Sequence, residues 1–261
     1  MDFATLLGII IGWGVLLYAI AEGPGLVTFI DIPGGMITLG GTLTSTMIHF
    51  PLSKMIGVFS ITKKAFLYKL PSPTAEIERM VKLARIARSE GLLALENSLE
   101  EVKDPFVQKS IQLVVDGTDP EVLRDVLTSE VEQLHQRHVL GKGVFDYMGA
   151  AAPSFGMIAT LIGLVQMMMN MKDAASLGAG MATALVATFY GSALANMICL
   201  PIAGKLEIRS KQEAVAKQLV IEGIGAIQAG LNPRLVEEKL KTFLEPKLRS
   251  GLRLQAAKRA A

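Results

Sequence analysis

The sequence predicts an all-α membrane protein: four transmembrane helices, a large helical cytoplasmic insert between spans two and three, and a helical cytoplasmic tail. Two bulk properties favour this class, because 51% of the 261 residues are hydrophobic at a mean hydropathy of +0.42, yet 19% are charged. Such residues must be segregated along the chain, which argues against a soluble enzyme domain or a disordered chain. The net charge of +2 excludes a generally basic nucleic-acid binder, and the single cysteine, Cys199, excludes an intramolecular disulfide.

The third observation is that the apolar residues fall into four blocks without any Asp, Glu, Lys or Arg. These blocks are Phe3–Ala21, Ile32–Phe50, Tyr147–Met171 and Ala179–Gly204. Each matches the length of about 20 residues that crosses a bilayer as a helix. The first block has the alternative interpretation of a signal peptide cleaved after Ala21, although it lacks a positively charged start. The second, rich in Gly and Thr, has the alternative of a buried helix in a soluble fold.

The basic residues predict which side of the membrane each connection occupies. Residues 52–146 contain 13 of the 26 Lys and Arg residues and residues 205–261 contain 12, whereas the connection 172–178 contains only Lys172. The positive-inside rule places the two rich segments, and therefore both termini, in the cytoplasm. The predicted domains are spans one and two with a short outer loop (1–51), a cytoplasmic helical domain (52–146), spans three and four (147–204) and a cytoplasmic helical tail (205–261).

The cytoplasmic segments are predicted to be helical surfaces for protein contacts. Residues 74–102 have apolar side chains at steps of three and four and are predicted to form a helix. Breaks are expected at Asp104-Pro105, at Gly117–Pro120 and at Asn232-Pro233. The insert carries 13 basic and 14 acidic residues, a balance that suits a protein partner better than phosphate. The tail has 12 basic and six acidic residues, so its excess charge can hold it against anionic lipid.

No motif for catalysis or cofactor binding occurs in the sequence. It has no P-loop, dinucleotide fingerprint or nucleophile elbow, so neither an enzyme nor a cofactor is expected. His135 and His138 could share a metal, but no cluster completes the site and a solvated helix face is the simpler interpretation. A membrane ion pathway is normally marked by ionisable residues within the spans, but these spans contain no Asp, Glu, Lys or Arg and offer only Thr, Ser, Asn, Gln, Tyr and His49. If the protein moves ions, the titrating carboxylate must therefore come from another chain.

Two intramembrane prolines and two hydroxyls are the candidate functional residues of the spans. Pro153 and Pro201 each lack an N–H and free a carbonyl four residues earlier, which gives either a hinge with a hydrated cation path or an ordinary helix kink. Thr160 and Thr188 fall at one predicted depth, where their hydroxyls either replace cation hydration or bond their own helix carbonyls. Small residues form stripes that permit close packing, along Pro153, Gly156, Thr160, Gly163 and Met167, and along Ala184, Thr188, Ser192 and Ala195.

Several segments, in this order and spacing, resemble the MotA/PomA flagellar motor stator subunits of the wider MotA/TolQ/ExbB proton-channel group. The resemblance runs from Met1 to about Leu244 and is carried by MDFATLLGIIIG, FIDIPGGMITLGGT, ARSEGLLALE, VDGTDPEVLRDVL, GAAAPSFGMIATLIGLVQMM, LVATFYGSALANMICLPIAGKL and NPRLVEEKLKTFL. The large insert between spans two and three distinguishes the chain from the three-span TolQ/ExbB branch. A TolQ/ExbB-like energiser of an outer-membrane system is the alternative function.

This resemblance implies partners and residue roles. It implies a pentamer around a dimer of a single-span MotB/PomB-type protein that supplies the ion-binding Asp, in the bacterial inner membrane, with the insert contacting the rotor protein FliG. Arg88 and Glu96 match the rotor-contact positions and would lie about 80° apart on one helix. Pro153 and Pro201 match the prolines tied to gating and torque, and Asp31 matches an acid near the outer mouth of sodium-type members.

The resemblance also bears on the coupling ion. Thr160 and Thr188 match the threonines of sodium-type stators, whereas many proton-type members have Ala at the first position. Sodium-type members often have a Thr pair in span four, and here the pair is Ala187-Thr188. The two threonines therefore favour sodium over protons, whereas Ala187 in place of the first threonine of the pair weakens this preference. The other classes that the sequence leaves for comparison are a self-sufficient transporter or membrane enzyme, which needs an intramembrane acid or metal site, and a purely structural membrane scaffold.

Overall fold

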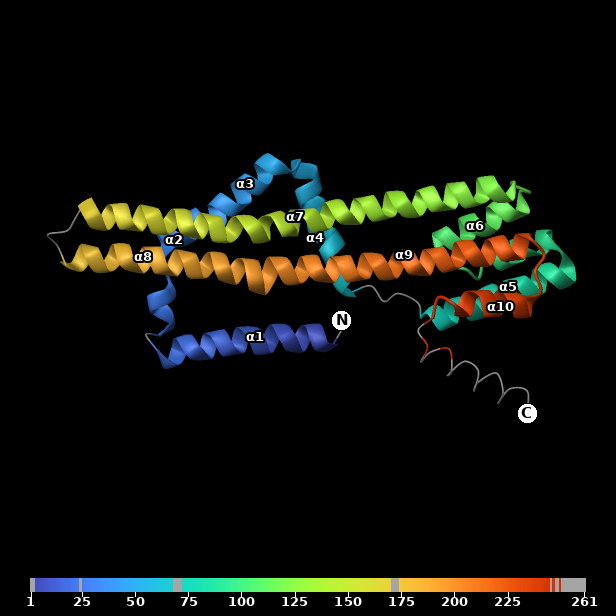
Figure 1. The fold of residues 1–261 in the computed structure, drawn as a ribbon, viewed down its shortest axis with the longest axis horizontal. Helices are drawn as coiled ribbons and strands as arrows, with labels where there is room; N and C mark the ends of the chain where they lie inside the picture. The colour runs from blue at the N-terminus through green and yellow to red at the C-terminus, as the bar shows by residue number, and fades with distance from the viewer. Residues whose placement is uncertain are drawn as a thin grey trace. The chain divides into compact units, whose positions relative to one another are not determined.

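The protein is seen here as a computed structural model that describes residues 3–23, 25–67, 72–169 and 174–244, together with Pro246 and Arg249. Every element in these residues is helical, as the sequence predicts (Figure 1). The chain divides into unit 1, residues 1–68 and 138–209, and unit 2, residues 69–137 and 210–261. Helices α7 (Pro120–Met169) and α9 (Leu200–Gln228) contribute residues to both units. Lys172, which entered the charge count, and the tail after Arg249 lie outside the described residues.

Unit 1 contains the four apolar blocks. Block one corresponds to α1, and block two forms one continuous helical run, in which a π-helical turn joins two α-helical pieces. Block three ends α7, except that residues 170 and 171 lie outside the described residues, and block four runs from α8 through a second π turn into α9. The remaining bounds in this unit are α1 (Phe3–Glu22), η1 (Leu26–Phe29), α2 (Ile32–Gly35), η2 (Met36–Gly40), α3 (Gly41–His49), α4 (Leu52–Leu67), α8 (Ala174–Ala193) and η4 (Leu194–Cys199).

Two of the described helices are long and apolar enough to cross a membrane. They are α7 and the continuous helix Leu177–Gln228, while Leu7–Glu22 is a shorter apolar helix. Only 28% of the apolar window of each long helix is buried, so most of this apolar surface has no partner within the chain. A core helix of a soluble protein would be mostly buried. The four-span topology and the domain boundaries drawn from it stay predictions, because no membrane defines them here.

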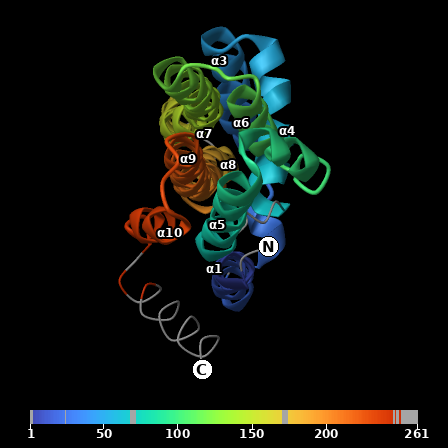
Figure 2. The same cartoon turned by 90° about the vertical axis from the view of Figure 1, so that its right-hand side faces the viewer.

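Unit 2 is a small helical assembly with its own core. Figure 2 shows α5 (Pro73–Glu90), α6 (Pro105–Val115) and α10 (Pro233–Lys241) gathered beside α7 and α9, and the 3₁₀ helix η3 (Leu92–Ser98) follows α5 in the chain. Their apolar faces meet in one cluster. The largest side chains that are fully buried there are Ile77, Met80, Leu95, Ile111, Leu123, Leu127, Leu219, Ile224 and Leu240.

Helix starts in unit 2 follow one local rule. A polar residue precedes a proline, and its side chain accepts a hydrogen bond from a backbone N–H of the first turn. Ser72 Oγ accepts from Ala75 N at 3.2 Å, and Asp104 Oδ1 accepts from Phe106 N at 2.9 Å. Asn232 caps α10 in the same way. Proline suits the first helical position because its missing N–H has no partner there anyway. The predicted breaks at Asp104-Pro105 and Asn232-Pro233 are thus confirmed.

The prediction of one helix over 74–102 is wrong. Gly91 ends α5 with φ 90°, a backbone conformation that favours glycine, and the chain continues as the 3₁₀ helix η3. The apolar periodicity continues past this point because Leu92 and Leu95 pack on the same core as α5. Periodicity alone therefore did not reveal the break, although Gly91 itself was the available signal.

An ion bridge joins three helices of unit 2. Glu222 of α9 accepts one hydrogen bond from Arg124 of α7 and makes an ion pair with Lys239 of α10, both at 2.6 Å. The Glu222 side chain is only 14% exposed, whereas its two partners are largely solvated. Its pKa is lowered from the ordinary value, first by the hydrogen bond from Lys239 and then by the two positive charges, against the opposing effect of burial.

Candidate functional site

The central feature of unit 1 is a seam of small residues where α7 and α8 run antiparallel in direct backbone contact (Figure 1). A Cβ added at Gly156 would lie 3.2 Å from Ala187 O and from Thr188 Cα. A Cβ added at Gly163 would lie 2.7 Å from Gly180 O. Because no side chain separates the helices at these points, the packing rests on close dispersion contacts between backbones.

Spacing explains why this seam is continuous. Gly149, Gly156 and Gly163 recur every seven residues on α7, and Ala152 and Ala159 between them are fully buried. A seven-residue repeat keeps one face of a helix against its partner over several turns. The predicted packing stripes are therefore partly right. Their members Gly156, Gly163, Ala184 and Ala195 are buried, whereas Ser192 is exposed and Met167 is half-buried.

The structure brings the surroundings of the two candidate prolines together. Pro153 lies inside α7, and Gly149, whose carbonyl it frees, packs on Leu200, the residue before Pro201. Pro201 lies one residue beyond the end of the π turn η4, and the N–H of Leu200, which stands between them, donates to Ala195 O. A π turn shifts the hydrogen-bond register by one residue, which accommodates a proline that has no N–H to donate. Pro201 therefore sits where the helix ladder is already irregular, whereas Pro153 lies within an α-helix that continues on both sides of it.

The hydroxyls of Thr160 and Thr188 bond their own helices. Thr160 Oγ1 donates to Met157 O at 2.6 Å, and Thr188 Oγ1 donates to Ala184 O at 3.1 Å. The sequence left open whether these hydroxyls replace cation hydration or bond carbonyls of their own helix, and the contacts seen here are of the second kind. Both residues are half-buried. Each hydroxyl oxygen keeps lone pairs that this donated bond does not use, so it can still accept a hydrogen bond or contact a cation.

Asp31 is held by a network that reaches α8. Its Oδ2 accepts from Gly34 N at 2.7 Å as the N-cap of α2, and its Oδ1 accepts from Thr183 Oγ1 at 3.0 Å. The Asp31 N–H donates to Tyr190 Oη at 3.1 Å, and the Tyr190 hydroxyl in turn donates to Phe29 O. The sequence reasoning selected Asp31 but missed Thr183 and Tyr190. Their spacing of seven residues, which places them on one helix face, was the available signal.

Arg88 and Glu96 lie on two different helices. Arg88 is in the last turn of α5, Glu96 is in η3, and Gly91 breaks the chain direction between them. The expected separation of about 80° on one helix is therefore wrong. Both side chains are exposed. Neither pairs with an opposite charge among the residues that the structure describes, in contrast to the nearby ion pair of Lys82 with Glu101 at 2.8 Å.

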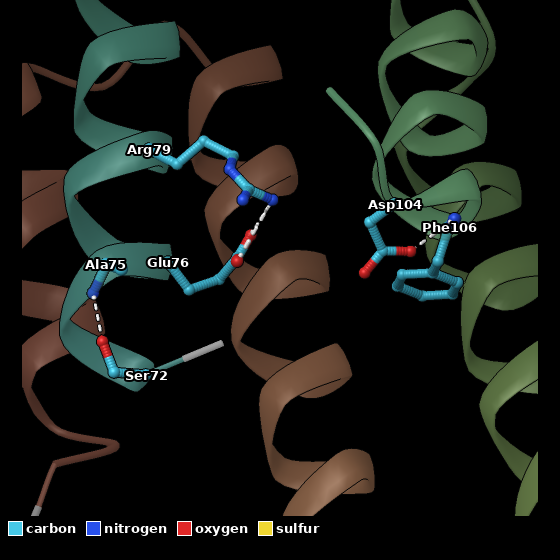
Figure 3. Close-up of polar contacts among 6 residues, drawn as sticks. All are labelled: Ser72, Ala75, Glu76, Arg79, Asp104 and Phe106. Atoms are coloured by element: carbon cyan, nitrogen blue, oxygen red, sulfur yellow. Dashed lines mark hydrogen bonds and ion pairs between the residues drawn. The ribbon is translucent and has the colours of Figure 1, made fainter. Parts of the chain in front are cut away.

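Unit 2 also contains a buried carboxylate that sequence reasoning did not single out. Glu76 of α5 has a side chain only 4% exposed, and both of its oxygens lie 3.2 Å from Arg79 Nη1. Figure 3 shows this pair beside the start of α6, where Asp104 caps the Phe106 N–H. Burial raises the pKa of Glu76, with a smaller contribution from Asp104 and with Arg79 and Lys217 opposing it.

Metal-ligating residues are not clustered in the described part of the chain, where no group of three or more His, Cys, Asp or Glu side chains is placed to hold a metal. Of the two histidines considered above, His135 contacts Ser210 Oγ through Nδ1 at 3.1 Å. This contact places the His135 ring against α9. The His135 residue as a whole stays exposed on its helix.

Comparison with known proteins gives the family. The chain is 41% identical over 244 residues to the chemotaxis protein PomA of Vibrio alginolyticus, covering 94% of this chain and 96% of PomA. It is 41% identical to motility protein A of Borreliella burgdorferi, covering 97% of each chain. A family profile, described as the MotA/TolQ/ExbB proton channel family, matches residues 98–218. The chain belongs to the MotA/TolQ/ExbB proton channel family.

Solved structures extend this likeness to the fold of this MotA/TolQ/ExbB family member. The flagellar MotAB stator complex from Bacillus subtilis superposes with a TM-score of 0.87 at 31% identity, covering 95% of this chain and 98% of that one. A C. jejuni MotAB structure has the same TM-score at 24% identity and shows the same fold. These relatives are motility and stator subunits and not enzymes, in agreement with the expectation from the sequence.

Proposed function

We propose that this chain is a stator subunit of the flagellar motor, with four spans and both termini in the cytoplasm of a bacterial inner membrane. Together with a single-span MotB/PomB-type partner it forms a cation channel whose ion flow generates torque. The observation that carries this proposal is the match to PomA over 94% of the chain. It is supported by the apolar helices, of which only 28% is buried in the isolated chain and which therefore need lipid or neighbouring subunits.

The partner supplies the acid on which ion transfer depends. In the described part of the blocks no residue carries a formal charge, and Asp31 just before block two has both carboxylate oxygens engaged. A self-sufficient ion path would need a titratable group within the spans. We therefore infer a pentamer of this chain around a partner dimer, whose intramembrane Asp binds the ion. The transported ion is cargo, and no cofactor is proposed.

Arg88 and Glu96 form the contact with the rotor protein FliG. Their exposed, unpaired charges can bind complementary charges on a partner without first breaking an internal ion pair. The break at Gly91 presents them from two elements, so they define a small surface and not a single helix stripe. Reversing either charge should reduce swimming while leaving the stator complex intact. Normal torque after both reversals would instead favour a structural scaffold.

Sodium is the favoured coupling ion. Thr160 and Thr188 keep free lone pairs while their hydroxyl hydrogens bond Met157 O and Ala184 O, which suits replacement of cation hydration better than proton relay. The Ala187-Thr188 pair, in place of two threonines, leaves one hydroxyl fewer at this level. Thr160→Ala should change the ion preference with little loss of stability. An unchanged sodium response would remove Thr160 from the pathway.

The test is complementation of a motile host that lacks its own stator. The chain is expressed with its single-span partner, and swimming speed is measured against external sodium at fixed pH and then against pH at fixed sodium. We expect swimming that rises with sodium. Swimming that responds only to pH would identify protons as the coupling ion. Failure to swim, together with rescue of a strain deficient in outer-membrane energisation, would favour the TolQ/ExbB-like alternative.

A further inference from the structure

The segment between α1 and α2 is fastened to α8 at two points. One is the Thr183 hydroxyl, which donates to Asp31 Oδ1, and the other is the Tyr190 hydroxyl, which bridges the Asp31 N–H and the Phe29 carbonyl. Residue 187 lies between these two points on the same face, where Ala187 O accepts from Thr38 Oγ1 at 3.2 Å. We call the side chains of Asp31, Thr183 and Tyr190 the latch.

Packing around the latch requires a glycine at position 34. A Cβ added at Gly34 would lie 2.5 Å from Asp31 Oδ2 and 3.0 Å from Ala187 Cβ. Glycine at this position therefore lets the N-cap and the α8 contact form together. Thr38 is fully buried on the next turn and continues the same docking surface. The carboxylate is thus oriented from both sides, by the first turn of α2 and by α8.

The latch also compensates the cost of placing an acid beside apolar surface. The neighbours of Asp31, Ile30 and Ile32, are 70% and 72% exposed, so they face the surroundings of the isolated chain. Thr183 lies within α8, in the fourth apolar block. A carboxylate next to hydrocarbon is tolerated only where donors satisfy it. Here the Gly34 N–H and the Thr183 hydroxyl are those donors.

We propose that Thr183 and Tyr190 are positioning residues that hold the Asp31 carboxylate in one orientation at the outer end of the cation path. This proposal rests on the proposed function. A fixed negative charge near a channel mouth raises the local cation concentration. Because both Asp31 oxygens are engaged, the acid acts through its field and its geometry, while the exchanging ion is bound elsewhere. Thr183 sets the direction of the carboxylate, and Tyr190 fixes the backbone that carries it.

The experiment measures the external sodium concentration that gives half-maximal swimming speed in the complemented host. Thr183→Val, which removes the donor while keeping the shape, should raise this concentration by about three- to tenfold, the equivalent of one ordinary intramolecular hydrogen bond. Thr183→Ser should restore it. Thr44→Val is the matched control, because Thr44 is exposed and donates only to carbonyls of its own helix. Asp31→Asn should produce a shift similar to that of Thr183→Val.

The double variant decides whether Thr183 acts through Asp31. If it does, Thr183→Val adds no further shift in the Asp31→Asn background. An equal shift in both backgrounds, or no shift beyond that of Thr44→Val, overturns the proposal. Hydrogen–deuterium exchange of residues 26–34 in the purified complex should be faster in Tyr190→Phe than in wild type, and unchanged exchange counts against the latch. If the wild-type chain does not support swimming, the proposed function is wrong. The latch is tested separately, because equal exchange of residues 26–34 in Tyr190→Phe and wild type would show that the latch is absent.

Discussion

Replacing Gly191 by Ala should push α7 and α8 apart at their tightest contact. A Cβ at Gly191 would lie 2.5 Å from Ala152 O and 3.1 Å from Pro153 Cα. Both atoms belong to backbone, so no flexible side chain can move aside. To reach the shortest ordinary contact of 3.4 Å, the helices must separate by about 0.9 Å at this point.

The expected cost follows from that displacement. A gap of 0.5–1 Å forfeits roughly a quarter to a half of each dispersion contact along the opened surface. Overpacking of this kind typically costs about 1–3 kcal/mol. At about 2–4 °C per kcal/mol for a chain of this size, the unfolding midpoint of the purified stator complex in detergent should fall by several degrees. Swimming should fall as well, because the displaced residue is next to Pro153.

Gly178→Ala provides the matched control on the same helix. A Cβ at Gly178 would meet nothing within 4 Å, so only the helix propensity changes. Alanine is favoured over glycine in a helix interior by about 1 kcal/mol, and this variant should therefore be at least as stable as wild type. If the unfolding midpoint of the Gly191→Ala complex equals that of the Gly178→Ala complex, direct backbone packing at this seam is refuted.

Three further outcomes are expected. Burial raises the pKa of Glu76 above the ordinary 4.5. The neutral carboxyl therefore stabilises unit 2 fully below pH 4.5, and this stabilisation is lost as the pH rises through the raised pKa. E76Q should flatten the decline of the unfolding midpoint over this pH range, and an unaltered pH profile would contradict the prediction. The pKa of Glu222 is lowered, so its ionised form stabilises unit 2 above pH 4.5 and this stabilisation is lost as the pH falls through the pKa of the folded state. E222Q should lower the free energy of unfolding, measured by chemical denaturation at neutral pH, by about 1–3 kcal/mol. The difference from wild type should vanish in acid. Pro153→Ala restores a helix hydrogen bond to Gly149 O and so removes the proposed hinge. The variant should still co-purify with the partner, but its swimming speed under high viscous load should fall. A swimming speed equal to that of wild type would argue against a hinge.

Local rules in the sequence predicted most of unit 2. The proline after a capping residue marks where α6 and α10 begin, because the cap and the fixed φ of proline both act within one turn. The end of α5 was missed because Leu92 and Leu95 extend the apolar pattern beyond Gly91. Glu76 was missed for a different reason. Its burial depends on other elements of unit 2 packing against α5, and no spacing on α5 alone reveals that.

In unit 1, the small-residue stripes predicted close packing but not its exact members. Gly156 and Gly163 face α8 and Gly149 faces Leu200 of α9, whereas Thr160 is only half-buried, because a seven-residue repeat and a four-residue stripe diverge around the helix. The π turn before Pro201 could not be predicted either. It depends on how the freed carbonyls are satisfied, which is decided by the neighbouring helix.

The sequence by itself determined that this chain is helical and rich in apolar blocks that contain no Asp, Glu, Lys or Arg, since these are properties of composition and order. From this followed the need for a partner that supplies an acid. Only the tertiary structure decided what Asp31 does, because Thr183 and Tyr190 lie more than 150 residues away along the chain and reach it through the docking of α2 on α8. Hydrogen bonds between distant residues depend on packing, and packing is a property of the whole fold.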